Sequence, residues 1–149
     1  MISLDGTSMD VLKEYLKDSR QSFREVSRNI GVSSGTVASR VRELQERGVI
    51  RRFTALLDYE KLGYELTAIT EVTVSEGMMM EVGEKVAKFD ASLGVYNITG
   101  DSDIMVLARF KTRKQLSDFT KTITKMEYVE RTRTHLVLNT LKEDFGILP

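Results

Sequence analysis

Residues Ser33–Ile50 read SSGTVASRVRELQERGVI, and this stretch predicts one amphipathic helix with a defined start and stop. Ser33 is a suitable N-cap, because its hydroxyl can accept a hydrogen bond from a first-turn N–H. Gly48 suits the left-handed position that ends a helix. Three apolar residues recur at i, i+4 and i+7 and predict one buried stripe. They are Val37, Val41 and Leu44.

The opposite face of this helix is small near its start and basic further along. Such a face can approach a DNA groove closely and reach base edges. The residues that we expect near the bases are Ser34, Gly35, Ala38, Ser39 and Arg42, with Ser33 and Thr36 on the same candidate surface. The candidates for phosphate contact are Arg40, Arg47, Arg51 and Arg52. For Arg40, an ion pair with a carboxylate of the same domain is an equally good interpretation.

The residues before Ser33 predict a shorter helix and a tight turn. Ser22 and Glu25 fit a capping box, with Ser22 at the N-cap and Glu25 at N3. Gly31-Val32-Ser33 then joins the two helices, and two helices linked by a three-residue turn with glycine form the helix-turn-helix pattern. An ordinary helical hairpin that binds nothing, or binds protein, fits the same spacing. The basic outward face favours DNA.

Charge is distributed unevenly along the 149 residues, although the net charge is zero. Residues 19–52 hold eight arginines and three glutamates, a net charge of +5, whereas residues 64–149 hold 11 basic and 13 acidic groups, a net charge of −2. A basic half joined to a mildly acidic half indicates a nucleic-acid module attached to a second domain. The sequence lacks a long apolar run, a signal peptide and cysteine, so we expect a cytoplasmic protein without disulfides and without a membrane span.

Flanking segments complete the first half. A first helix is expected with Ser8 as its N-cap, and Ile50–Leu57 is expected to form a β-ribbon, or wing. In the second half, alternating and helical periodicities follow one another. Strands are expected at Glu65–Ser75, Val95–Thr99, Ile104–Phe110 and Val129–Leu141, with helical stripes at Met79–Phe89 and Leu116–Met126. This β-α-β-β-α-β order is the ferredoxin-like arrangement, whose sheet has one bare face that we expect a partner subunit to cover.

Short motifs are spread along the whole chain. They include Leu4-Asp5, Asp18-Ser19-Arg20, Arg40-Val41-Arg42-Glu43-Leu44, Gly48-Val49-Ile50, Leu62-Gly63 and Gly100-Asp101-Ser102-Asp103. In their order and spacing, the chain resembles the Lrp/AsnC (feast/famine) family of prokaryotic transcription regulators, and the last motif is similar to the G-x-x-D turn of that family.

The resemblance implies an α+β protein: an N-terminal winged helix-turn-helix joined to a C-terminal ferredoxin-like βαββαβ domain of the RAM type. We expect a DNA-binding domain at residues 1–50, a wing and linker strand at 51–63, and an effector-binding and oligomerisation domain at 64–149. The implied partners are double-stranded DNA, a second copy in a homodimer that assembles into tetramers, octamers or larger rings, and a small amino-acid effector.

An effector site is expected around the Gly100–Asp103 turn, at a contact between C-terminal domains. Asp101 or Asp103 can meet the ammonium of an amino acid, with Asp103 favoured because it matches the family turn. The N–H groups around Gly100 and the hydroxyls of Thr132 and Thr134 can meet its carboxylate. A plain hairpin turn fits the same residues and is compatible with such a site.

We find no pattern that predicts an enzyme, a metal site or a cofactor. His135 is the single histidine and there is no cysteine, so a nucleophile–histidine pair or a cluster of metal ligands is not expected. The sequence therefore predicts a sequence-specific DNA-binding regulator. The alternative is a winged helix used for protein contact, with a small-molecule-sensing ferredoxin-like domain and no specific DNA site.

Overall fold

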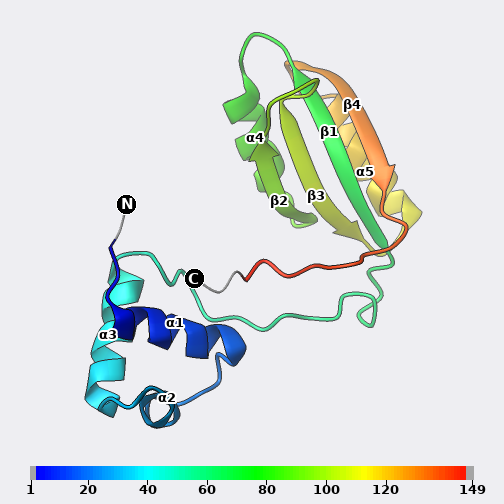
Figure 1. The fold of residues 1–149 in the computed structure, drawn as a ribbon. Helices are drawn as coiled ribbons and strands as arrows, with labels where there is room; N and C mark the ends of the chain where they lie inside the picture. Colours follow the sequence, from blue (N-terminus) through cyan, green and yellow to red (C-terminus); the bar gives the residue numbers. More distant parts are fainter. Residues whose placement is uncertain (1–2, 147–149) are drawn as a thin grey trace. The chain divides into compact units, whose positions relative to one another are not determined.

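The computed structural model describes residues 3–146, which form two compact units. One unit runs to Leu56 and includes the tail that starts at Lys142; the other is Leu57–Leu141. The division falls inside the expected linker at 51–63. The first two and last three residues of the expected domains lie outside the described part (Figure 1).

The first unit contains three helices: α1 (Gly6–Lys17), α2 (Phe23–Ile30) and α3 (Ser34–Glu46). The predicted capping box at Ser22 and Glu25 is present, and Gly31 has a φ of 73° where α2 turns toward α3. The helices share one apolar core, formed by Val11, Tyr15, Val26, Val37, Val41 and Leu44. The predicted stripe of α3 is therefore the side that packs against α1 and α2.

The first helix begins three residues earlier than predicted, so the expectation of Ser8 as its N-cap is wrong. The cap is Asp5, whose carboxylate accepts a hydrogen bond from the Ser8 N–H at 2.8 Å. Ser8 occupies the third helical position and is buried. Aspartate caps a helix as well as serine does, and at Asp5 the carboxylate also pairs with Arg40 of α3.

The expected wing strand at Ile50–Leu57 is also not formed in this chain. Residues 51–57 have no regular secondary structure and are exposed. A β-strand is stabilised by hydrogen bonds to a neighbouring strand, and within residues 3–146 this segment pairs with none. The side chains of Leu56 and Leu57 are consequently left in solvent.

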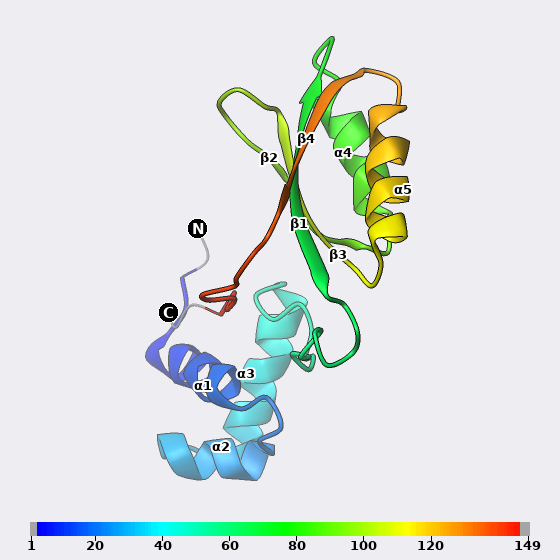
Figure 2. The same ribbon diagram turned by 90° about the vertical axis from the view of Figure 1, so that its right-hand side faces the viewer.

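The second unit has the predicted β-α-β-β-α-β order. Its elements are β1 (Leu66–Val74), α4 (Met79–Ala87), β2 (Ser92–Asn97), β3 (Ile104–Phe110), α5 (Arg113–Thr124) and β4 (Val129–Leu136). All strand pairs are antiparallel in the order β2-β3-β1-β4. Both helices cover the same face of the sheet (Figure 2), which confirms the ferredoxin-like fold with one open face.

Two strand boundaries differ from the prediction by three residues or more. β2 begins at Ser92, three residues before the expected Val95, and β4 ends at Leu136, five residues before the expected Leu141. The register explains the second difference, because Leu136 is already opposite Ala68, near the start of β1. One more backbone bond, from the Val137 N–H to Thr67 O, ends the pairing.

Side-chain alternation separates the two faces of the sheet. Even-numbered residues of β1 and β3 point toward the helices and form the core, whose buried members are Ala68, Val72, Val74, Val82, Val86, Ile104, Val106, Ala108, Phe110, Phe119 and Ile123. Odd-numbered residues of the same strands lie on the open face. No helix within residues 3–146 is long and apolar enough to cross a membrane.

Candidate functional site

The outward face of α3 begins at a capped N-terminus, as predicted. Ser33 Oγ accepts a hydrogen bond from the Thr36 N–H at 3.0 Å, and the two hydroxyl oxygens lie 2.9 Å apart. These hydroxyls are therefore engaged in capping the helix. Gly48, with a φ of 70°, follows the last turn in the predicted left-handed conformation.

Beyond the cap, α3 presents the residues that the sequence placed near DNA bases. Ser34, Gly35, Ser39 and Arg42 are exposed, and Ala38 is half-buried. Arg42 has no ion-pair partner within residues 3–146. The side of α3 that faces the other helices is apolar and buried, so it fixes which residues point outward.

Arg40 and Arg47 are held inside the domain. One guanidinium nitrogen of Arg40 lies 2.7 Å from Asp5 Oδ2 and the other 2.9 Å from Glu43 Oε2. Arg47 pairs with Glu43 Oε1 at 2.9 Å and donates to the carbonyl of Ser3 at 3.1 Å. Hydrogen bonds from these arginines lower the pKa of Glu43. Of the two interpretations of Arg40, the structure shows the ion pair.

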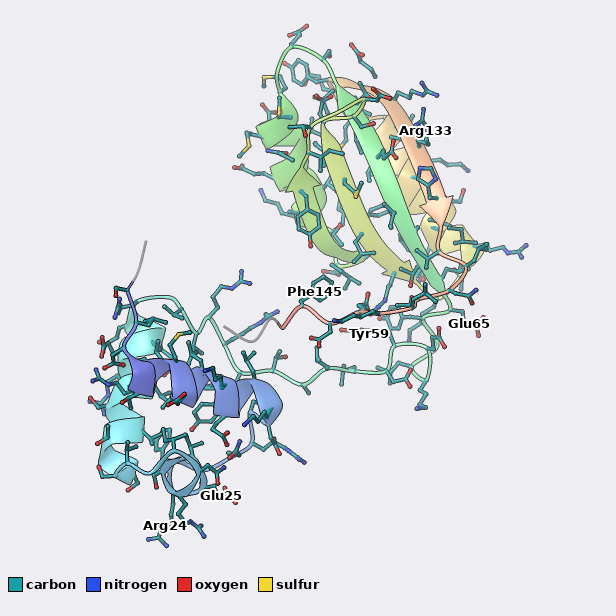
Figure 3. All side chains as sticks on the ribbon, in the orientation of Figure 1. Arg24, Glu25, Tyr59, Glu65, Arg133 and Phe145 are labelled. Carbon is teal, nitrogen blue, oxygen red and sulfur yellow. The ribbon has the colours of Figure 1, made fainter. Side chains whose placement is uncertain are left out.

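Other arginines of the basic segment remain exposed. Arg51 and Arg52 follow α3 without regular structure, and Arg24 extends from α2 into solvent (Figure 3). Arg20 is different, because its guanidinium donates two hydrogen bonds to Asp18 and its backbone N–H donates a third; these bonds lower the pKa of that carboxyl to about 2. The exposed guanidinium groups give this unit its positive surface.

A polar junction between α1 and α2, which the sequence analysis missed, supports the helix-turn-helix. The buried carboxylate of Glu14 accepts hydrogen bonds from Lys17 Nζ at 2.6 Å and Asn29 Nδ2 at 2.7 Å. Gln21 bonds to Asn29 and to the Glu14 carbonyl. These bonds lower the pKa of Glu14. No local sequence pattern predicts this cluster, because Glu14 and Asn29 are 15 residues apart in the chain.

In the second unit, the predicted Gly100–Asp103 turn joins β2 to β3. Gly100 has a φ of 122°, which favours glycine at that position. Asp103 is used structurally: its Oδ2 accepts from the Val74 N–H at 2.8 Å, and its own N–H donates to Val72 O at 3.0 Å. The carboxylate favoured for the effector ammonium thus ties the turn to β1.

Thr132 and Thr134 lie on the helix-covered face of the sheet. Thr132 Oγ1 is 2.9 Å from Thr124 Oγ1 of α5, and Thr134 Oγ1 is 3.1 Å from Thr70 Oγ1, which is fully buried. The structure therefore does not bring these two hydroxyls together with Asp101, which lines the pocket described next.

Next to the turn, the open face contains a polar pocket of about 220 Å³, which we call the sheet pocket. Its lining residues are Glu71, Thr73, Asp101, Ser102, Arg131 and Arg133. Of the predicted effector residues, only Asp101 is among them. Arg133 of β4 is visible on this face in Figure 3.

The sequence analysis missed the other five lining residues. Alternation was the available signal: Glu71, Thr73, Arg131 and Arg133 are odd-numbered, like the half-exposed residues of β1. Their register across β1 and β4 required the three-dimensional structure, which pairs Glu71 with Arg133 and Thr73 with Arg131. Within residues 3–146, no group of His, Cys, Asp or Glu side chains is arranged to hold a metal ion.

Each of the two units matches a known protein family. Residues 4–51 match the family model described as winged helix-turn-helix DNA-binding, and residues 67–147 match the Lrp/AsnC ligand binding domain. The chain is 38% identical to an uncharacterized HTH-type transcriptional regulator of Pyrococcus horikoshii over 99% of this chain and 100% of that protein. It is 37% identical to the HTH-type transcriptional regulator FL11 of Pyrococcus abyssi, over 95% and 94% of the two chains.

Solved structures agree with these matches. The leucine response regulatory protein LrpA of Mycobacterium tuberculosis superimposes with a TM-score of 0.84 at 27% identity, over 98% of this chain and 100% of that chain. The relatives are transcriptional regulators, not enzymes. With a helix-turn-helix unit, a ferredoxin-like ligand-binding unit and relatives that match both along almost their whole length, this chain belongs to the Lrp/AsnC family of transcriptional regulators.

Proposed function

We propose that the protein binds a specific duplex DNA sequence with α3 in the major groove. The observation that carries this proposal is the outward face of α3, where small side chains and the unpaired Arg42 are exposed on a helix whose other side is anchored in the core. The major groove admits an α-helix, and arginine reads guanine by a bidentate contact. Ser34, Gly35, Ala38 and Ser39 allow the close approach that this contact needs.

Phosphate contacts are assigned to a smaller set than the sequence predicted. Arg51 and Arg52 are exposed just after α3, and the N-terminus of α3 offers backbone N–H groups to a phosphate. Arg40 and Arg47 already bind carboxylates of their own domain. We therefore assign them to holding the N-terminal segment and α3 together.

The functional unit is proposed to be a homodimer joined through the open sheet faces, assembled further into tetramers, octamers or larger rings. Ile69, Leu107, Met105 and Tyr96 lie together on that face, because the register pairs Ile69 with Leu107 and Met105 with Tyr96. Apolar side chains grouped on an uncovered sheet face favour association. A two-fold dimer presents two copies of α3 to two half-sites.

The second unit is proposed to bind a small amino acid as effector, and binding between subunits would couple effector level to assembly. The family model for this unit is a ligand-binding domain, and one structural relative is named for its response to leucine. A ligand shifts an assembly equilibrium only by its different affinity for the two states. We also propose that the protein works in the cytoplasm, because that is where a prokaryotic transcription regulator meets the chromosome.

Selection from a random duplex library with the full-length chain tests the DNA proposal. Sequencing of the bound DNA is expected to give a pseudo-palindrome, with half-sites one helical turn or a small multiple apart. The selected site should bind at least about 10³-fold more tightly than random DNA at physiological salt. Equal affinity for both would refute the proposal and favour the alternative, a helix-turn-helix that contacts protein.

A further inference from the structure

Four charged side chains form a chain of ion pairs on one flank of α3. They are Asp5, Arg40, Glu43 and Arg47, and we call them the flank network. Glu43 stands four residues after Ser39 of the outward face, so the network borders the surface that is proposed to meet DNA. Two carboxylates and two guanidinium groups give the network a formal net charge of zero. This flank therefore adds no net positive charge beside the outward face.

The two arginines of the flank network are held in different ways. Arg40 lies between two carboxylates, 2.7 Å from Asp5 and 2.9 Å from Glu43, and its Nε is buried. Arg47 pairs with a single carboxylate in the described part of the chain, that of Glu43 at 2.9 Å, and its other contact is the carbonyl of Ser3. Removal of the charge on Glu43 would therefore leave Arg40 paired and Arg47 unpaired.

An unpaired Arg47 would join a group of arginines that can bind phosphate. Arg47 is the C-cap of α3, and Arg51 and Arg52 follow it closely, exposed and without ion-pair partners among the residues described. A phosphate contact supplies affinity for every DNA sequence alike, because the phosphates carry no base information. To reach a phosphate in the wild type, Arg47 must leave Glu43, whose carboxylate would then repel that phosphate.

We propose that Glu43 raises the sequence specificity of DNA binding by keeping Arg47 from contacting phosphates. A protein can discriminate by weakening its binding to competitors as well as by strengthening its binding to the correct site. A genome offers about 10⁶–10⁹ competing nonspecific sites, so weaker binding to those sites is useful in itself. This inference rests on the proposed binding of a specific duplex by α3.

Release of Arg47 should favour random DNA over the selected site. On the selected site, base contacts hold α3 in one position, so Arg47 can reach only the phosphates that lie beside that position. On random DNA the protein slides along the backbone and can stop wherever its arginines reach the most phosphates. The ratio of the two affinities is therefore the quantity that Glu43 is expected to control.

Fluorescence anisotropy with the full-length protein tests the proposal on a random duplex and on the duplex obtained by selection. Glu43→Gln removes the charge and keeps the shape of the side chain. It should bind random DNA more tightly by about 3- to 10-fold for each subunit in contact, and the slope of log K against log salt should become steeper by about 0.9 for each subunit. The gain on the selected duplex should be smaller.

Two further substitutions identify the group that is released. Arg47→Gln should change the affinity for random DNA little in the wild type, where Arg47 is already paired, and should abolish the gain in the Glu43→Gln background. Glu46→Gln is the matched control, because Glu46 is an exposed carboxylate of the same helix without an ion-pair partner among the described residues. It measures the effect of one lost negative charge, and its salt slope should equal that of the wild type. Urea unfolding checks that all variants are folded.

The outcomes distinguish this inference from the function on which it rests. If the wild type binds both duplexes equally, the proposed function fails and there is no specificity for Glu43 to control, so both fall. If the wild type discriminates but Glu43→Gln keeps its affinities and salt slope, the function stands, the flank network only stabilises the fold, and the inference is refuted. An equal gain on both duplexes, or a gain that persists in the double variant, refutes it as well.

Discussion

Arg42→Ala tests most directly how α3 reads DNA. The side chain is exposed, has no ion-pair partner among the described residues and lies on the outward face of α3. Its removal leaves no buried charge and places alanine, a strong helix former, inside a helix. We therefore expect the free energy of unfolding to change by less than about 0.5 kcal/mol.

The effect on binding should be much larger. A bidentate contact to a base contributes about 1–3 kcal/mol. A dimer presents Arg42 to both half-sites, so the variant should lose about 2–6 kcal/mol on the selected DNA, which is roughly 30-fold to 10⁴-fold in affinity. The loss should be confined to one base position in each half-site, with little loss on random DNA.

Fluorescence anisotropy over a range of salt concentrations measures both quantities. A base contact leaves the dependence of log K on log salt nearly unchanged, whereas each lost phosphate contact lowers the slope by about 0.9. Arg40→Ala is the comparison, because Arg40 is paired with Asp5 and Glu43; it should lower the melting temperature and keep the base preference. If Arg42→Ala instead weakened all sequences equally with a smaller salt slope, Arg42 would be a phosphate contact and the assigned role would be refuted.

Four further predictions follow from the packing and the charges. Gly83→Ala should raise the free energy of unfolding, measured in urea, by about 0.5–1 kcal/mol, because Gly83 is helical and the added Cβ would lie at ordinary contact distances of 3.7–3.9 Å. Gly77→Ala is the control: Gly77 has a φ of 71°, so an alanine there should lower the free energy of unfolding. Leu44 is 1% exposed, so Leu44→Ala should lower the free energy of unfolding by about 2–5 kcal/mol. DNA binding should be lost as the variant approaches its own melting temperature. An unchanged melting curve would contradict the core described for the first unit. Hydrogen bonds lower the pKa values of Asp18, Glu14 and Glu43 in the folded protein, Asp18 to about 2. The stability that these carboxylates contribute is therefore complete above their ordinary pKa values of 3.8–4.5 and is lost as the pH falls through the lowered values. Melting temperatures measured from pH 6 to 2 should show this decline, and the decline should be smaller in Glu14→Gln. Residues 57–141 alone should stay folded and sediment as a dimer, and a stable monomer at micromolar concentration would argue against association through the open face.

Local sequence was sufficient where a structure depends on neighbours along the chain. The capping box at Ser22 and Glu25, the buried stripe of α3 and the limits of β3 are all as predicted, because helical and strand periodicities are written into consecutive residues. The order of strands and helices then restricts the topology to few choices, and the β-α-β-β-α-β order by itself predicted the ferredoxin-like one.

Local sequence was insufficient where a second segment decides the outcome. The wing segment has β-like residues, but a strand needs a neighbour, and none lies beside it in residues 3–146. Asp5 caps α1 in place of Ser8 and pairs with Arg40, 35 positions further along the chain. The missing partner strand and the Asp5–Arg40 ion pair cannot be obtained from a window of ten or twenty residues, whereas the choice of Asp5 as cap is local.

The functional sites show the same division. The sequence determined that an outward, basic face exists on α3, since the apolar stripe fixes its opposite side. Only the tertiary structure decided which arginines on that segment are paired with carboxylates and which are exposed. In the second unit, composition pointed to the Gly100–Asp103 turn, but strand register placed Thr132 and Thr134 toward the helices and Arg131 and Arg133 beside Asp101. A shift of one residue in a strand exchanges its two faces, so the lining of the sheet pocket is determined by pairing between strands and not by the residues of any one strand.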